Sequence, residues 1–217
     1  RKEGFNFKGE SDTEVILMGF EAWGVKRTLE LISGMFAFAV WDEHNTSLII
    51  ARDRIGIKPL YYSINERNFL FASQLKSIVK YRGSVPQISV NGLNEYLRLG
   101  YIPSPLSIFN DVYKLQPSHY ISFSDGEISE PKPYWNIKDV VIKSKKCQFT
   151  DESNAIHSLK SCLEDSISRH MVSDVPLGAF LSGGVDSSTV VAVMQSLSSK
   201  PIKTFSIGFN QNDYNEA

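Results

Sequence analysis

A short glycine- and serine-rich run near the end of this 217-residue chain limits its fold more than any other feature. The run is Leu181-Ser182-Gly183-Gly184-Val185-Asp186-Ser187-Ser188. It lies between an apolar segment, 175–181, and a stretch with apolar residues at helical spacing, 190–197, so it predicts a strand, a tight turn and a helix. Glycines let the backbone approach an anion, and serine hydroxyls add donors beside the free amides of a helix N-terminus. The run therefore predicts a phosphate-binding loop.

The composition of this loop separates it from two common nucleotide motifs. It contains no lysine, unlike G-x-x-x-x-G-K-[ST], and it does not follow G-x-G-x-x-G. It resembles the SGGxDS pyrophosphate loop of the ATP pyrophosphatases. The resemblance implies that ATP adenylates an acceptor here and that Asp186 helps to hold Mg²⁺. The residues it assigns to ATP in the loop are Ser182, Gly183, Gly184, Asp186, Ser187 and Ser188. The alternative is a plain strand-to-helix turn in which Asp186 and Ser187 only cap the helix.

The first half of the chain carries helix-start and hairpin signals. Ser11-Asp12-Thr13-Glu14 has the form of a capping box, so a helix is expected to begin near Asp12, and a second short helix through 28–31 to end at Gly34. Short β-prone runs at 35–41, 47–51, 60–64 and 68–72, separated by turn residues, predict hairpins in an antiparallel meander. Further predicted elements are a helix capped by Ser73 through Val79, a helix from Asn91-Gly92 through Leu99, and a hairpin over 122–128 that turns at Asp125-Gly126.

The second half begins after a lysine-rich stretch without a long apolar period. We assign residues 136–150 to a linker, 1–135 to one domain and 151–217 to another. Apolar residues from Ala155 to Met171 predict a long helix, 175–181 is a candidate for a buried strand, and 202–209 is expected to be a second strand parallel to it. The expected fold is α+β in the first domain, followed by the start of an α/β domain.

Several segments of the first half resemble the class II glutamine amidotransferase domain of asparagine synthetases. The matching segments are 11–16, 34–39, 52–61 and 71–73, and the order and spacing continue to resemble the family through 134–135 and on to 174–176 in the second half. The resemblance implies an Ntn-type glutaminase fold and a role for Asp12 in binding the α-ammonium of glutamine. It also assigns backbone contacts with ATP to Leu181 and Ile207. Without it, Asp12 would be a charge at a helix start and Leu181 and Ile207 ordinary strand residues.

The chain departs from this family at two points. Gln74 stands where the family leads us to expect an acidic residue. The family also uses an amino-terminal cysteine as nucleophile, whereas residue 1 is Arg, and neither Cys147 nor Cys162 can supply a free α-amine. We therefore expect an internal fragment of a larger protein that is inactive alone, with both cysteines reduced and structural.

A charged run, Arg52-Asp53-Arg54, precedes Gly56, Lys58 and Pro59. These charges could be mistaken for a catalytic cluster. The favoured interpretation is structural: a turn braced by ion pairs and stiffened by its glycine and proline, lying toward the domain interface.

The overall charge excludes some partners. The chain has 23 basic and 24 acidic residues and a pI near 6.5, so it lacks the basic surface of a nucleic-acid or anionic-membrane binder. No apolar run reaches the length of a membrane span, and the start has no signal core. We expect a cytoplasmic protein with small substrates, and a homodimer when intact.

For the intact enzyme, the resemblance implies three steps. Glutamine is hydrolysed to glutamate and ammonia, and ATP and aspartate form β-aspartyl-AMP and pyrophosphate. Ammonia then attacks the adenylate, which gives asparagine and AMP. Three alternatives stay open. One keeps the architecture with another acceptor, as in β-lactam synthetase or a sugar or peptide amidotransferase. Another is a non-catalytic relative that only binds nucleotide. The third, a tRNA-modifying pyrophosphatase, is disfavoured by the near-neutral charge.

Overall fold

The computed structural model describes residues 5–9, 11–65 and 68–208. The chain divides into two compact units after Ile142, and each is described by itself. This division falls inside the segment 136–150, where helix α4 (Ile137–Ser144) occupies much of the expected linker. The domain ranges assigned from the sequence stay a prediction.

Helix α1 (Asp12–Leu31) begins at the predicted residue. Ser11 is its N-cap, and the Ser11 hydroxyl accepts a hydrogen bond from the Thr13 amide at 3.2 Å. Gly24, with φ of 74° and ψ of 174°, kinks the helix between its two expected parts. Thr28 secures the second part, because its hydroxyl donates to the Gly24 carbonyl at 2.8 Å.

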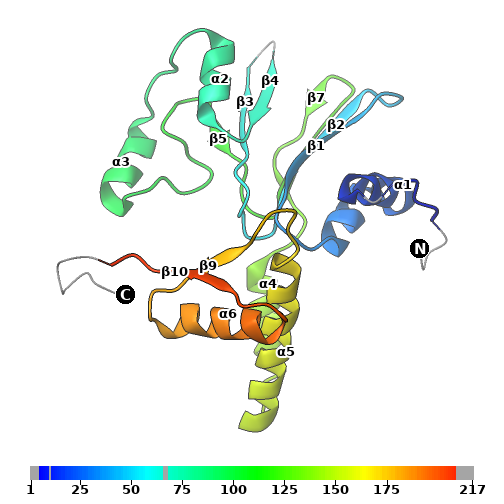
Figure 1. The fold of residues 1–217 in the computed structure, drawn as a ribbon. Coiled ribbons are helices and arrows are strands. Elements are labelled where there is room, and N and C mark those ends of the chain that lie inside the picture. Colours follow the sequence, from blue (N-terminus) through cyan, green and yellow to red (C-terminus); the bar gives the residue numbers. More distant parts are fainter. Residues whose placement is uncertain (1–4, 10, 66–67, 209–217) are drawn as a thin grey trace. The chain divides into compact units, whose positions relative to one another are not determined.

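The strands of the first unit form two antiparallel sheets (Figure 1). One contains β1 (Ala37–Asp42), β2 (Ser47–Arg52), β6 (His119–Ser124), β7 (Glu127–Ile128) and β8 (Lys132–Pro133); the other contains β3 (Tyr61–Ile64), β4 (Phe69–Ala72) and β5 (Tyr113–Lys114). The predicted hairpins β1–β2, β3–β4 and β6–β7 are confirmed. The single meander is wrong, because β2 pairs with the distant β6 while the chain after β2 crosses to the second sheet.

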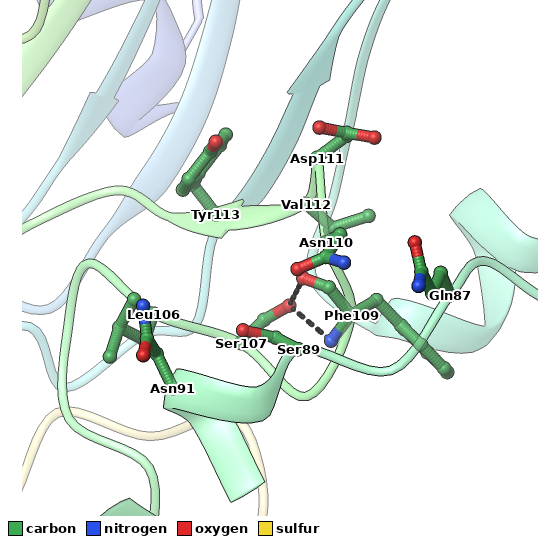
Figure 2. A pocket seen from close by; sticks show the side chains of 10 residues that line it. All are labelled: Gln87, Ser89, Asn91, Leu106, Ser107, Phe109, Asn110, Asp111, Val112 and Tyr113. Carbon is green, nitrogen blue, oxygen red and sulfur yellow. Dashed lines mark hydrogen bonds between the residues drawn. The ribbon is translucent and has the colours of Figure 1, made fainter. Parts of the chain in front are cut away.

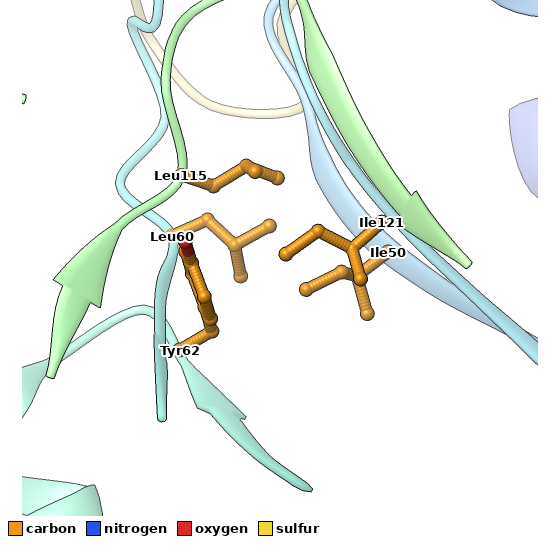
Figure 3. Packing of buried hydrophobic residues seen from close by; sticks show 5 residues of the cluster. All are labelled: Ile50, Leu60, Tyr62, Leu115 and Ile121. Atoms are coloured by element: carbon orange, nitrogen blue, oxygen red, sulfur yellow. The ribbon is translucent and has the colours of Figure 1, made fainter. Parts of the chain in front are cut away.

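Successive residues of β2 point to opposite faces of its sheet, and each face packs in a hydrophobic core. Ile50 packs against Leu60, Tyr62, Leu115 and Ile121, which come from both sheets (Figure 3). Its neighbour Ala51 packs on the opposite face with Leu29 of α1 and with Tyr134. The period of two along this strand thus places one core between the sheets and another beneath α1.

Two helix starts differ from the sequence prediction. Helix α2 (Leu75–Arg82) follows Gln74, whose side chain makes no capping hydrogen bond, so Ser73 is not the cap. Helix α3 (Val90–Leu99) is capped by Ser89, whose hydroxyl accepts from the Gly92 amide at 3.1 Å. Gly92 lies inside this helix rather than before it. The position requires glycine, because a Cβ there would lie 2.1 Å from the Ser107 carbonyl oxygen.

The second unit contains α5 (Glu152–His170), β9 (Gly178–Phe180), α6 (Val185–Ser196) and β10 (Lys203–Phe205). The predicted parallel pairing is confirmed, with Gly178 opposite Lys203 and Phe180 opposite Phe205. The strands are shorter than predicted, and Phe209 lies outside the described residues. The fold class is therefore antiparallel α+β followed by a parallel β-α-β unit.

Burial in the second unit differs from the prediction. The segment 175–181 was expected to be a buried strand, yet Val175 is 70% and Phe180 is 76% exposed, because the sheet described here has two strands only. Cys147 and Cys162 are free thiols, as expected, but both are exposed and so do not belong to a core. Among the described helices, none combines the length and the apolar composition that crossing a membrane requires.

Candidate functional site: the loop between β9 and α6 and the start of α1

The predicted phosphate loop joins the end of β9 to the start of α6. Its base is fixed to β10: the Leu181 amide donates to the Phe205 carbonyl at 2.9 Å, and the Ser206 hydroxyl donates to the Leu181 carbonyl at 2.6 Å. Gly183 has φ of 76°, the left-handed region in which a side chain would be strained. The turn therefore depends on this glycine and on the neighbouring strand.

Serine hydroxyls close the loop from inside. The Ser187 hydroxyl accepts from the Ser182 amide at 3.3 Å, lies 3.1 Å from the Ser182 hydroxyl, and donates to the Gly184 carbonyl at 3.1 Å. The N-cap of α6 is Gly184, which makes no side-chain capping bond. The alternative in which Asp186 and Ser187 cap the helix is therefore wrong. Among the described residues no side chain caps the start of α6, and the first amides of a helix have no intrahelical acceptor, which suits an anion.

The remaining predicted ATP residues gather around this turn. Asp186 and Ser188 are exposed in the first turn of α6, and Leu181 is half-buried. Ile207, 64% exposed, follows Ser206 beyond the end of β10. All lie beyond the carboxyl ends of two parallel strands, where open α/β sheets bind their ligands.

The chemistry of the loop fits a phosphate ligand better than a metal ion alone. Within the described residues, no group of three or more His, Cys, Asp or Glu side chains could hold a metal. Asp186 is the acidic residue in the first turn of α6. Mg²⁺ is commonly bound by one or two carboxylates together with substrate phosphates, so Asp186 beside the free amides is compatible with a metal–phosphate complex.

Asp12, the predicted glutamine ligand, is exposed at the start of α1. Its carboxylate lies 3.5 Å from the Thr13 hydroxyl. An exposed carboxylate at a helix N-terminus is available to a cationic group. Its role toward glutamine stays a prediction.

Glu14 is a residue of this region whose contacts the sequence did not reveal. Instead of closing a capping box on Ser11, its carboxylate accepts hydrogen bonds from the amides of Lys8 and Gly9, each at 2.8 Å. These two bonds lower the pKa of Glu14 below its usual range. The S-x-x-E spacing signalled an acceptor at this position but could not identify its donors.

Arg52 braces the segment between β2 and β3. Its guanidinium donates to the carbonyls of Lys58 at 2.7 Å, Leu115 at 2.6 Å and Gly56 at 2.7 Å. Burial lowers the pKa of Arg52 from its usual value. Asp53, fully buried, accepts from the amides of Ile57 and Lys58, each at 2.9 Å. The structural role is therefore confirmed, but the predicted ion pairs are wrong: charged side chains hold backbone groups.

The same segment anchors elements at both ends of the unit. Arg54 donates to the Glu30 carbonyl at the end of α1, at 2.6 Å, and its guanidinium carbon lies 5.9 Å from the centre of the Trp135 ring. The buried Tyr134 hydroxyl donates to the Arg52 carbonyl at 2.8 Å, and burial raises its pKa. Helix α1 and the approach to α4 are thus held by one loop.

A polar cavity of about 410 Å³ lies between the start of α3 and the approach to β5 (Figure 2). Sequence analysis did not indicate it. In its lining, the Ser107 hydroxyl bonds to both the amide and the carbonyl of Phe109 at 3.1 Å. Gln87, Asn91 and Asp111 add further polar side chains to the lining. Asp12 and the β9–α6 loop do not line this cavity.

Comparisons with known proteins match both parts of the chain. Residues 1–135 match the family of the glutamine amidotransferase domain, and residues 158–217 match the asparagine synthase family. The chain is 35% identical over 218 residues to glutamine-hydrolyzing asparagine synthetase 3 of Bacillus subtilis, covering 98% of this chain and 34% of that protein.

Two further relatives extend this comparison. A putative glutamine-hydrolyzing asparagine synthetase 2 of Methanocaldococcus jannaschii is 38% identical over 221 residues, which cover 99% of this chain and 41% of that protein. Amidase chry2 of Gibberella zeae is 32% identical over 193 residues, which cover 89% of this chain and 28% of that protein. The chain spans less than half the length of each of these relatives.

Proposed function

Because this chain belongs to the glutamine amidotransferase domain family, we propose that it is part of an enzyme that transfers the amide nitrogen of glutamine to aspartate. The observation that carries this proposal is the succession of two matches in one chain. A glutamine amidotransferase match ends at residue 135, and an asparagine synthase match begins at 158 and contains the loop between β9 and α6. The proposed domains are 1–135 and 151–217, joined by a linker at 136–150.

The proposed reaction has three steps. Water hydrolyses the glutamine side-chain amide to glutamate and ammonia. The aspartate β-carboxylate attacks the α-phosphorus of ATP, which forms β-aspartyl-AMP and releases pyrophosphate. Ammonia then attacks the acyl carbon and expels AMP, which leaves asparagine. Keeping the two sites in separate domains protects the acyl-adenylate from water.

The loop between β9 and α6 is proposed to bind the phosphates of ATP. The free amides at the start of α6 and the exposed Ser182 and Ser188 hydroxyls are donors for phosphate oxygens. We assign Leu181 and Ile207 to backbone contacts beside the adenine. Asp186 would hold Mg²⁺, whose charge would offset that of the departing pyrophosphate.

The remaining assignments follow from the same proposal. Glutamine, aspartate and ATP are the proposed small-molecule partners. The proposed location is the cytoplasm, where these metabolites are available, and the proposed assembly is a homodimer.

The proposal is tested with the full-length protein supplied with ATP, Mg²⁺, aspartate and either glutamine or ammonia. We expect asparagine, AMP and pyrophosphate in equal amounts from either nitrogen source, and equimolar glutamate from glutamine. ADP and phosphate in place of AMP and pyrophosphate would contradict the proposed adenylation.

A second candidate keeps this chemistry but changes the acceptor. This candidate is favoured by the similarity to amidase chry2, a protein that matches 89% of this chain but is not named as an asparagine synthetase. The same pyrophosphate assay, run with aspartate omitted and other carboxylates added singly, separates the two candidates. Dependence on aspartate supports asparagine synthesis, whereas dependence on another carboxylate supports the second candidate.

Asp12→Asn in the full-length protein is expected to raise the KM for glutamine by about 10- to 100-fold, the loss expected for one charge-assisted contact with the α-ammonium. Ammonia-dependent asparagine synthesis should stay unchanged. Glu21→Gln, which neutralises another exposed acid of α1, is the matched control and should leave both activities intact. Equal loss of both activities in Asp12→Asn would instead mark a folding role.

A further inference from the structure

We propose that Glu14 is a positioning residue for glutamine binding: its carboxylate holds the backbone of Lys8 and Gly9 against the first turn of α1 and so fixes the position of Asp12. This inference rests on the proposed role of Asp12, and it adds a second acidic side chain with a different task.

The contact is a two-pronged clamp. Oε1 of Glu14 accepts from the Lys8 amide and Oε2 from the Gly9 amide, both at 2.8 Å. A Cβ on Gly9 would lie 3.2 Å from Oε2, tighter than ordinary contact, so the missing side chain favours this close approach. One carboxylate thus occupies two consecutive amides that precede the helix.

The clamp is stronger than an ordinary capping contact. Hydrogen bonds to an ionised carboxylate are roughly twice as strong as neutral ones. Glu14 also lies in the first turn of α1, where the helix dipole favours negative charge. Glu14 is ionised at neutral pH, so both of its oxygens can accept, and the bonds from the two amides lower its pKa further.

The position of the Asp12 carboxylate depends on the backbone at the start of α1, because the side chain itself makes few contacts. In the part of the chain that the structure describes, its carboxylate has one hydrogen bond, a long one of 3.5 Å from the Thr13 hydroxyl. Besides the backbone bonds of the helix itself, the Ser11 cap, at 3.2 Å, and the Glu14 clamp hold the turn containing Asp12. A binding group needs a supported backbone to keep its geometry, so loss of the clamp should weaken glutamine binding through Asp12.

The test compares Glu14→Ala, Glu14→Gln and the control Glu21→Ala in the full-length protein. We expect Glu14→Ala to raise the KM for glutamine about tenfold, with the ammonia-dependent rate unchanged. Glu14→Gln should give a smaller increase than Glu14→Ala, because its amide keeps one of the two oxygen acceptors of the clamp. Glu21, exposed on the same helix, should have no effect when truncated.

The double variant Asp12→Asn with Glu14→Ala identifies the route of the effect. If Glu14 acts through Asp12, the KM of the double variant equals that of Asp12→Asn alone. Additive increases, an unchanged KM in Glu14→Ala, or parallel loss of ammonia-dependent synthesis and Tm would each overturn the inference. If Glu14→Ala does not fold, a KM for Glu14→Gln equal to the unsubstituted value overturns it. An Asp12→Asn variant with an unchanged KM overturns the proposed role of Asp12 instead.

Discussion

Asp186→Ala in the full-length protein is expected to lower aspartate-dependent pyrophosphate release at least about 100-fold, the scale of losing one preorganised group that stabilises transition-state charge. Asp186 is exposed in the first turn of α6, beside the amides proposed to hold the phosphates. Removing its carboxylate would weaken Mg²⁺ binding to the departing pyrophosphate. Glutamate release from glutamine should remain, because that reaction is proposed for residues 1–135.

The matched control is Asp165→Ala in the same unit. Asp165 is exposed on α5, where it bonds to Arg169 at 2.9 Å, and an exposed pair of this kind contributes about 0.5 kcal/mol or less. Pyrophosphate release should therefore stay near the unsubstituted rate. Near-normal release by Asp186→Ala, measured beside glutamate release from glutamine, would remove this loop from the proposed chemistry.

The turn of this loop could be predicted from the sequence because the bonds that close it are local. Gly183 supplies the left-handed backbone, and Ser182 and Ser187 close the turn within a few residues of one another. The start of α1 was predicted equally well, since Ser11 caps it directly. Such features depend on the turn chemistry of neighbouring residues, which a single sequence displays.

Features that depend on distant partners could not be predicted. The pairing of β2 with β6 joins Ile50 to Ile121, and no local pattern specifies that choice over a pairing with β3. The carboxylate of Glu14 could close on Ser11 or on the preceding backbone, and the spacing fits both. The apolar segment 175–181 has the composition of a buried strand, but burial depends on which other elements cover it.

Arg52→Met is expected to lower the free energy of unfolding of the first unit by about 3 kcal/mol. The buried guanidinium serves the carbonyls of Gly56, Lys58 and Leu115, and methionine can replace its packing but none of its donors. A hydrogen bond from a charged group contributes about 1.5–3 kcal/mol, and water can reach part of this loop after the substitution, so the expected loss is below the sum of three such bonds.

Arg52→Lys separates charge from geometry, because an ammonium carries the same charge but lacks the planar fork that serves several carbonyls at once. We expect it to recover less than half of the loss. Lys58→Ala is the control: the Lys58 carbonyl accepts from Arg52 whatever its exposed side chain is. Urea unfolding of the 217-residue chain, followed by tryptophan fluorescence, reports this unit, since its three tryptophans, Trp23, Trp41 and Trp135, all precede Ile142. A decrease below about 1 kcal/mol for Arg52→Met, within the range of ordinary substitutions, would show that the brace is not needed for stability.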